Sequence, residues 1–149
     1  MTAETDRLIK GTYETDKTIC GVRKIYRNNS RWSVVVPLLI RQRSEYQNEK
    51  TVYTAINKDT DTMFVGLSME DLQSFISPGT RVRKRTIGKV DSRITIPTEE
   101  IHEGFFEDAV ESAIEWHKEY NIMRVRPALP EDIYESRYAS RRRRDEQNK

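Results

Sequence analysis

Residues 81–101, RVRKRTIGKVDSRITIPTEEI, have the pattern of two short β-strands joined by a tight turn. Residues 83–88 alternate between two faces, and residues 93–96 alternate again, because successive strand side chains point to opposite faces. Pro97 ends the second strand, since it has no N–H for a ladder hydrogen bond. Six of the thirteen residues from Arg81 to Arg93 are basic and one is acidic. A β-hairpin with a basic outer face and an apolar inner face predicts a polyanion as its partner.

The same pattern occurs earlier in the chain in a looser form. Residues 19–27 are strand-like, residues 28–30 are a turn cluster, and residues 32–36 form a second strand that Pro37 closes. Pro37 and Pro97 lie 60 residues apart. A repeat of this period in so short a chain predicts two fused copies of one unit.

Residues 88–101 resemble the signature of the AbrB/SpoVT/MazE-like swapped-hairpin family, which is a V-R-K-V-D strand, a turn and then G-R-[IV]-x-I-P-x-E-[IL]. Lys89-Val90-Asp91 correspond to the end of the first strand, Arg93 to the turn arginine, and residues 94–97 to the second strand. In the first copy, Val22-Arg23-Lys24-Ile25 and Val34-Val35-Val36-Pro37 match the same two strands, with a longer turn between them. The resemblance implies a duplicated swapped-hairpin β-barrel whose basic strands and loops contact double-stranded DNA.

The expected DNA contacts are the basic residues of the two hairpins, with the arginine run near the end of the sequence as an auxiliary arm. They are Arg23, Lys24, Arg27, Arg31, Arg83, Lys84, Arg85, Lys89 and Arg93, and in the tail Arg141, Arg142, Arg143 and Arg144. Such residues neutralise phosphates and release counterions, and arginine also fits guanine in the major groove. The alternative is a solvated strand edge, where the same charges discourage aggregation. Trp32 and Tyr26 are expected in the core rather than as stacking platforms for bases.

The remaining segments predict a mainly β protein with α additions. Residues 51–67 predict a hairpin, Ser68 predicts the cap of a short helix over 69–76, and residues 123–126 predict a strand. Residues 105–120 show the three-and-four spacing of an amphipathic helix with an acidic outer face. The expected organisation is a flexible arm at 1–16, a first AbrB-like unit at 17–67, a short helix and linker at 68–80, a second unit with a helical extension at 81–138, and a basic disordered tail at 139–149.

Composition favours an assembly in which two units share a core. Hydrophobic residues make up 36% of the 149 residues and charged residues 34%, so a single small unit has little apolar surface to bury. A homodimer or an intrachain pseudo-dimer is therefore expected. No apolar run approaches membrane-spanning length, and we expect a cytoplasmic, nucleoid-associated protein without a membrane partner.

The sequence offers little chemistry for an enzyme. His102 and His117 have no metal-binding spacing, phosphate-binding glycine loops are missing, and Cys20 is the single cysteine. Cys20 is expected to be a small buried residue. We therefore expect no catalytic residues, no metal and no cofactor.

A transcriptional regulator is the expected function, and two alternatives stay open. One is a viral or nucleoid structural protein that binds nucleic acid without sequence choice. The other is an antitoxin-like protein that binds a partner through residues 103–138. In either case the acidic helix at 105–120 is a possible protein-binding surface.

Overall fold

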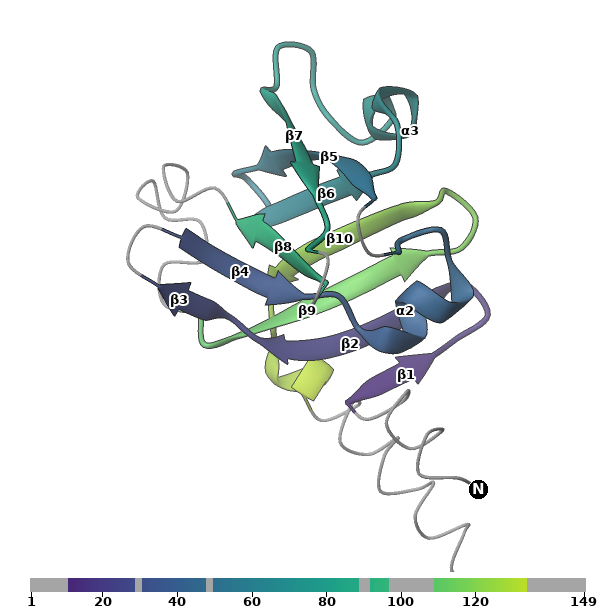
Figure 1. Ribbon diagram of the computed structural model, residues 1–149, viewed down its shortest axis with the longest axis vertical. Helices are drawn as coiled ribbons and strands as arrows, with labels where there is room; N and C mark the ends of the chain where they lie inside the picture. The colour runs from purple at the N-terminus through teal and green to yellow at the C-terminus, as the bar shows by residue number, and fades with distance from the viewer. Residues whose placement is uncertain (1–10, 29–30, 48–49, 89–91, 97–108, 134–149) are drawn as a thin grey trace, which may run out of the picture.

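The computed structural model describes residues 11–28, 31–47, 50–88, 92–96 and 109–133, whose strands form two antiparallel sheets (Figure 1). In spatial order the large sheet contains β1 (Thr12–Glu14), β2 (Thr18–Lys24), β9 (Glu111–His117), β10 (Ile122–Pro127), β6 (Thr62–Gly66), β5 (Thr51–Asn57) and β7 (Val82–Thr86). The small sheet contains β3 (Tyr26–Asn28), β4 (Arg31–Val35) and β8 (Arg93–Ile96). The helices are α2 (Leu38–Arg43) and α3 (Met69–Gln73). The expected mainly β fold with short helices is confirmed.

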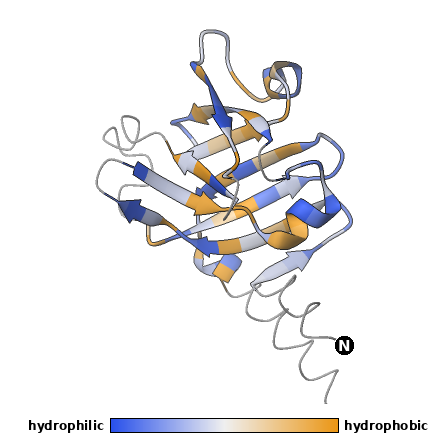
Figure 2. Cartoon of the chain, viewed as in Figure 1, coloured by the Kyte–Doolittle hydropathy of each residue, from blue (hydrophilic) through white to orange (hydrophobic). Residues whose placement is uncertain are grey.

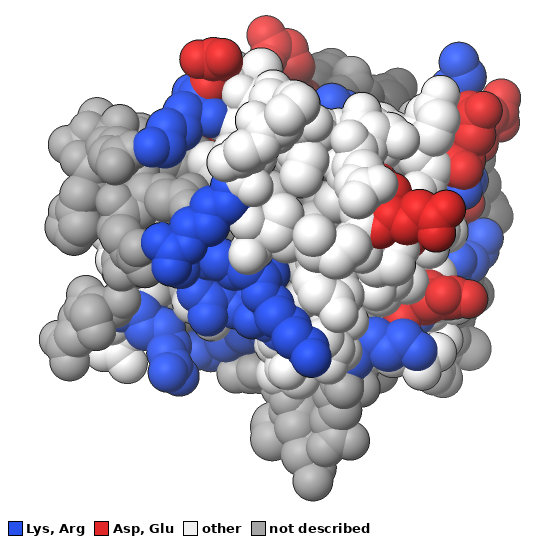
Figure 3. All heavy atoms as spheres, turned by 90° about the horizontal axis from the view of Figure 1, so that it is seen from above, with Lys and Arg blue, Asp and Glu red and all other residues white. Residues whose placement is uncertain are grey.

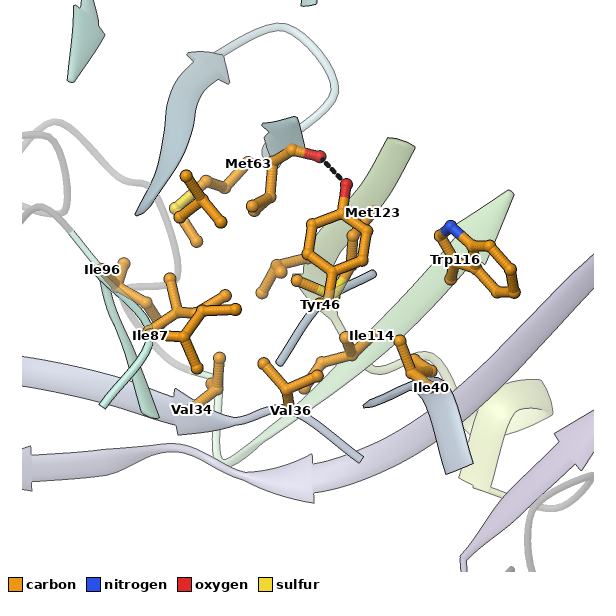
Figure 4. Close-up of a cluster of buried hydrophobic side chains, with 14 of the residues drawn as sticks. Val34, Val36, Ile40, Tyr46, Met63, Ile87, Ile96, Ile114, Trp116 and Met123 are labelled. Carbon is orange, nitrogen blue, oxygen red and sulfur yellow. Dashed lines mark hydrogen bonds between the residues drawn. The ribbon is translucent and has the colours of Figure 1, made fainter. Parts of the chain in front are cut away.

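The main hydrophobic core lies between the two sheets (Figure 4). The small sheet contributes Val34, Ile94 and Ile96, and the large sheet contributes Ile114 and Met123 among others, all fully buried. In both sheets, buried side chains alternate along the strand with side chains on the opposite face. The core therefore takes every second residue of strands from both halves of the chain.

Tyr46 anchors this core through its hydroxyl group. The side chain is fully buried, and the hydroxyl donates a hydrogen bond of 2.8 Å to the carbonyl oxygen of Val65 (Figure 4). Burial raises the pKa of Tyr46 well above its ordinary value, so the hydroxyl keeps its proton.

A second, smaller core lies on the other face of the large sheet, under α3. Ser68 caps this helix by accepting a hydrogen bond of 3.1 Å from the backbone N–H of Asp71, so the predicted cap is confirmed. The helix ends at Gln73, earlier than the predicted Ile76. Leu72 packs with Phe64 and Ile122. Figure 2 shows the difference in hydropathy between β6, which carries Phe64, and the more hydrophilic edge strands β3 and β7.

The strand pairing is symmetric about the β10–β6 pair of the large sheet and the β4–β8 pair of the small sheet, with β1 and β3 outside the pattern. From β2 to β7 the large sheet has the order β2-β9-β10-β6-β5-β7. Counted from one end, β2, β9 and β10 hold the places that β7, β5 and β6 hold when counted from the other end. In the central pairs, Val34 faces Ile94 and Phe64 faces Arg124, so both pairs join residues 60 positions apart. The two strands that precede Pro37 and Pro97 thus lie side by side, as β4 and β8.

The two hairpin turns repeat the same 60-residue spacing. β5 and β6 form the hairpin predicted at 51–67, and β9 and β10 form a second hairpin of the same kind. Asp61 and Asn121 end the two turns with φ of 51° and 54°, in the left-handed region that Asn and Asp tolerate better than most residues. The two hairpins therefore share the length of their turns, 58–61 and 118–121, and the backbone geometry at the last turn residue.

The predicted closed barrel is wrong for the part of the chain that the structure describes. Both sheets are open, with β1 and β7 at the ends of the large sheet and β3 and β8 at the ends of the small one. A barrel requires the first and last strands of one sheet to pair, and here the core is instead enclosed by two separate layers.

The predicted helix at 105–120 is wrong over Glu111–His117, which form β9. β9 pairs with β2 along one edge and with β10 along the other, and these ladders override the local helical spacing. Residues 105–108 lie outside the described part of the chain. The predicted arm at 1–16 also needs correction, because Thr12–Glu14 form the edge strand β1.

The end of the described chain is a helical turn at 130–133, within the helical extension expected at 81–138. Within the described residues, no helix combines the length and the apolar character needed to cross a bilayer.

Candidate nucleic-acid interface

The outward face of the small sheet is polar and basic. Since Val34 and Ile94 point into the core, their neighbours Ser33, Arg93 and Thr95 point away from it. Arg31, Arg93 and Tyr26 are exposed, Tyr26 to 40%. The charged residues of β3, β4 and β8 are Arg27, Arg31 and Arg93, and these three strands contain no acid. This face is suited to an anion.

Two of these arginines are held by aromatic rings. The guanidinium carbon of Arg93 lies 4.4 Å from the centre of the Tyr26 ring, and that of Arg27 lies 4.2 Å from the centre of the Trp32 ring. Such cation–π contacts contribute about 0.5–1 kcal/mol at exposed sites and fix the plane of the guanidinium group. Arg27 also donates to the backbone carbonyl of Ala109, so part of its role is structural. Of the two, Arg93 lies on the outward face of the small sheet.

The aromatic residues divide between the core and the surface. Trp32 packs against the main core, as expected, whereas the exposed Tyr26 does not belong to it. Strand alternation was the missed signal, because Tyr26 directly follows the buried Ile25. Thr95 was also missed; it is partly exposed and adds a hydroxyl group to the outward face, whereas its partner Ser33 is buried.

The basic residues of β7 lie at the edge of the large sheet. Arg83 and Arg85 are half-buried and face the same side as their partners Thr54 and Val52, which is the side of the main core. Lys84 points to the other face and is exposed. β8 follows β7 in the chain, and the backbone N–H of Gly88 donates a hydrogen bond of 2.9 Å to the carbonyl of Arg93. Arg83 and Arg85 thus lie on the core side of β7, whereas Arg93 points away from the core.

Arg23, one of the predicted DNA contacts, makes hydrogen bonds that join two strands. Its guanidinium group donates to the carbonyl of Val22 at 2.9 Å and to the hydroxyl of Thr12 at 3.3 Å, which joins β2 to β1. Burial lowers the pKa of Arg23, as expected for a cation removed from water.

The structure does not bring the two basic strands together. Four strands of the large sheet lie between β2 and β7, so Arg23 and Lys24 are far from Arg83, Lys84 and Arg85 along the sheet. The small sheet carries the predicted residues Arg27, Arg31 and Arg93: Arg27 shares the face of Trp32, and Arg31 and Arg93 lie on the outward face. Lys89 and the tail arginines 141–144 lie outside the described residues.

Seen from above, Lys and Arg side chains gather in one region of the surface, while most Asp and Glu lie away from it (Figure 3). On the outer face of the large sheet, by contrast, charges are paired with one another. Glu115 accepts a hydrogen bond of 2.5 Å from Arg124, and Asp132 accepts two from Arg126, at 2.6 and 2.9 Å. These arginines are already neutralised by carboxylates and are poor candidates for phosphate contacts.

Cys20 is buried beside this network, as expected, and is not arranged as a nucleophile. Burial raises its pKa to about 11, so it remains a protonated thiol near neutral pH. Among the described residues, no group of His, Cys, Asp and Glu is arranged to hold a metal ion.

The segment expected to bind a protein partner is largely part of the sheet. Residues 103–138 include β9 and β10, which occupy the middle of the large sheet. An extended or helical arm that wraps a partner is therefore incompatible with residues 111–127 of this fold.

Comparisons with protein-family models, with curated proteins and with solved structures find no match to this chain. The resemblance to the AbrB-like family rests on the residues around Pro37 and Pro97.

Proposed function

We propose that this chain is a DNA-binding transcriptional regulator of the AbrB-like type that contacts double-stranded DNA through the outward face of the small sheet. The observation that carries the proposal is the exposed group of Arg31, Arg93 and Tyr26 on strands without acidic residues. Arg83 and Arg85 lie on β7, on the side of the main core, and are not part of this face. No cofactor is required.

The chemistry of this face suits a duplex. A β-ribbon or small sheet can enter the major groove, where an arginine contacts guanine through two hydrogen bonds. Arg93 is already oriented by Tyr26, which reduces the entropy lost when its guanidinium group is fixed. Thr95, which is partly exposed, supplies a hydroxyl group that can bond a phosphate or a base edge.

The symmetric strand pairing supports the proposed duplication within one chain. Each proposed unit contains two strands before its proline and then a hairpin: β2, β4, β5 and β6 in the first, and β7, β8, β9 and β10 in the second. β2 of the first unit pairs with β9 of the second, while β7 of the second pairs with β5 of the first. This exchange of strands is the arrangement expected of an intrachain pseudo-dimer of swapped hairpins.

The decisive experiment is selection of bound fragments from random duplex DNA at two salt concentrations. A regulator enriches a defined sequence at both concentrations. A packaging protein, the remaining alternative, enriches none and loses affinity uniformly and steeply as salt rises. Absence of binding at low salt would contradict both functions.

Single substitutions then test the proposed face on the selected duplex. Arg93→Ala and Arg31→Ala should each weaken binding by about 1–3 kcal/mol if they contact bases, or by less at phosphates. Lys17→Ala is the matched control, because Lys17 is an exposed cation in the turn between β1 and β2. Equal affinities of all three variants for DNA would refute the assignment of this face.

A further inference from the structure

The two outer strands of the symmetric arrangement differ in what covers them. On β2 the outer edge is covered by β1, and the backbone N–H of Val22 bonds the carbonyl of Gly11 at 3.0 Å. β7 holds the equivalent place at the other end, and within the described residues it pairs with β5 alone. Within the described residues, β2 therefore has a further strand paired to its outer edge, whereas β7 does not.

The register identifies the backbone groups on that edge. The N–H of Ile87 bonds the carbonyl of Lys50 at 2.9 Å, in register with the pairs that Arg85 and Arg83 make with β5. Hydrogen-bonded residues alternate along an antiparallel strand, so Arg83 and Arg85 direct their N–H and C=O groups toward β5. Val82, Lys84 and Thr86 consequently direct theirs outward, as Val22 does on β2.

The side chains of β7 determine which strand fits this edge. β7 reads VRKRT, with three basic residues and no acid. Another copy of β7 would place like charges opposite one another, which is unfavourable. A strand with acidic side chains would instead form cross-strand ion pairs. At the covered end, the covering strand β1 carries an acid that is paired with a cation of the sheet: Glu14 accepts a hydrogen bond of 2.7 Å from Lys118, which directly follows β9.

We propose that the edge of β7 binds an extended acidic segment of a partner protein as an added β-strand. Val82, Lys84 and Thr86 offer alternating N–H donors and C=O acceptors, and a peptide backbone satisfies both. DNA phosphates accept hydrogen bonds but donate none, so they would leave the carbonyls unsatisfied. This site goes beyond the proposed DNA interface and does not depend on it.

The probe is a short fluorescein-labelled peptide of alternating glutamate and threonine, titrated into the full chain and followed by fluorescence anisotropy. Its control is the same peptide with every backbone amide N-methylated, which keeps the charge and removes the donors. The proposal predicts that N-methylation weakens binding by at least about tenfold. Equal binding of both peptides, or no binding of the first, would overturn it, leaving the basic edge as a device against aggregation.

Two substitutions at Lys84 separate the contribution of its backbone N–H from that of its side-chain charge. Lys84→Pro removes the outward N–H and leaves the ladder to β5 intact, because proline is tolerated on the open side of an edge strand. It should weaken binding of the acidic peptide by at least about tenfold, whereas Lys84→Thr should change it by less than about fivefold. Unchanged binding by Lys84→Pro contradicts the proposal. If that variant does not fold, the two peptides on the unmodified chain decide the question.

Discussion

At the scale of single residues, the pairing of an arginine with an aromatic ring is the most specific feature of the small sheet. Tyr26 carries no charge, yet it lies under the guanidinium group of Arg93 at 4.4 Å. Its contribution to DNA binding should therefore pass through Arg93.

Replacement of Tyr26 by leucine should weaken binding of the selected duplex by about threefold, in line with the energy of an exposed cation–π contact. In an Arg93→Ala background the same replacement should have almost no effect, since its partner is gone. Dissociation constants for the two single variants, the double variant and the unmodified chain give this coupling. Additive losses would show that Tyr26 acts on its own, for example by stacking on a base.

A titratable residue on the outer face of the large sheet links stability to pH. Burial lowers the pKa of His117 from its ordinary 6.5, and the nearby charge of Arg124 lowers it further, although Glu115 acts in the opposite direction. Because the folded pKa is the lower one, the unfolded chain takes up the proton first as pH falls. Folding should accordingly lose stability below about pH 6.5.

Urea unfolding at about pH 7.5 and 5.5 measures this effect, and the free energy of unfolding should be smaller at the lower pH. His117→Gln, which does not titrate, should reduce the difference between the two values. A chain that is more stable at the lower pH would contradict the predicted shift of the His117 pKa.

Residue identities alone were also enough to find part of the candidate site. Arg31 and Arg93 were predicted from basic strands that each end in an apolar–proline step, and the structure places them in the same sheet. Arg23 has the same sequence context, but its role depends on β1, which covers β2. A contact with a strand that the sequence pattern did not predict cannot be read from the neighbours of Arg23.

At the scale of elements, β2 passes very close to the start of α2. A Cβ atom added to Gly21 would lie 2.6 Å from Cγ of Pro37, well inside van der Waals contact. The proline that ends the first pair of strands therefore packs on the one residue of β2 that lacks a side chain.

Gly21→Ala should destabilise the fold by about 1–3 kcal/mol, because the proline ring is rigid and the strand is held on both sides. Pro37→Ala should relieve part of this strain, so the double variant should be more stable than the sum of the single effects. The free energies of unfolding of the four proteins in urea test this coupling. A Gly21→Ala variant as stable as the parent would show that β2 and α2 can move apart.

Elements bounded by clear turn or cap residues were predicted well, and the central strand β9 was not. β5 and β6 flank a polar turn at 57–61, and Ser68 supplies a helix cap, so both are visible in the local sequence. β9 is buried on both faces, and its apolar residues fit helical spacing as well as strand alternation. β9 is a strand because it pairs with β2, which is distant in sequence, and with β10, which follows it.

At the scale of the whole molecule, two arrangements coincide: a strand order with internal symmetry and a surface with segregated charge. The pair Val34 and Ile94 joins β4 to β8 and lies at the centre of the symmetric pattern. The outward face on either side of that pair belongs to both halves of the chain. If the proposal is right, one chain presents the DNA-binding face that a dimer of single units would otherwise provide.

The most direct test of the proposed DNA interface on the small sheet is a titration of the isotope-labelled chain with the selected duplex, followed by amide chemical shifts. We expect the largest changes of amide chemical shift in β3, β4 and β8, smaller changes in β7, and little change in β9 and β10. Changes confined to β9, β10 and the Glu115–Arg124 network, with none in the small sheet, would contradict it.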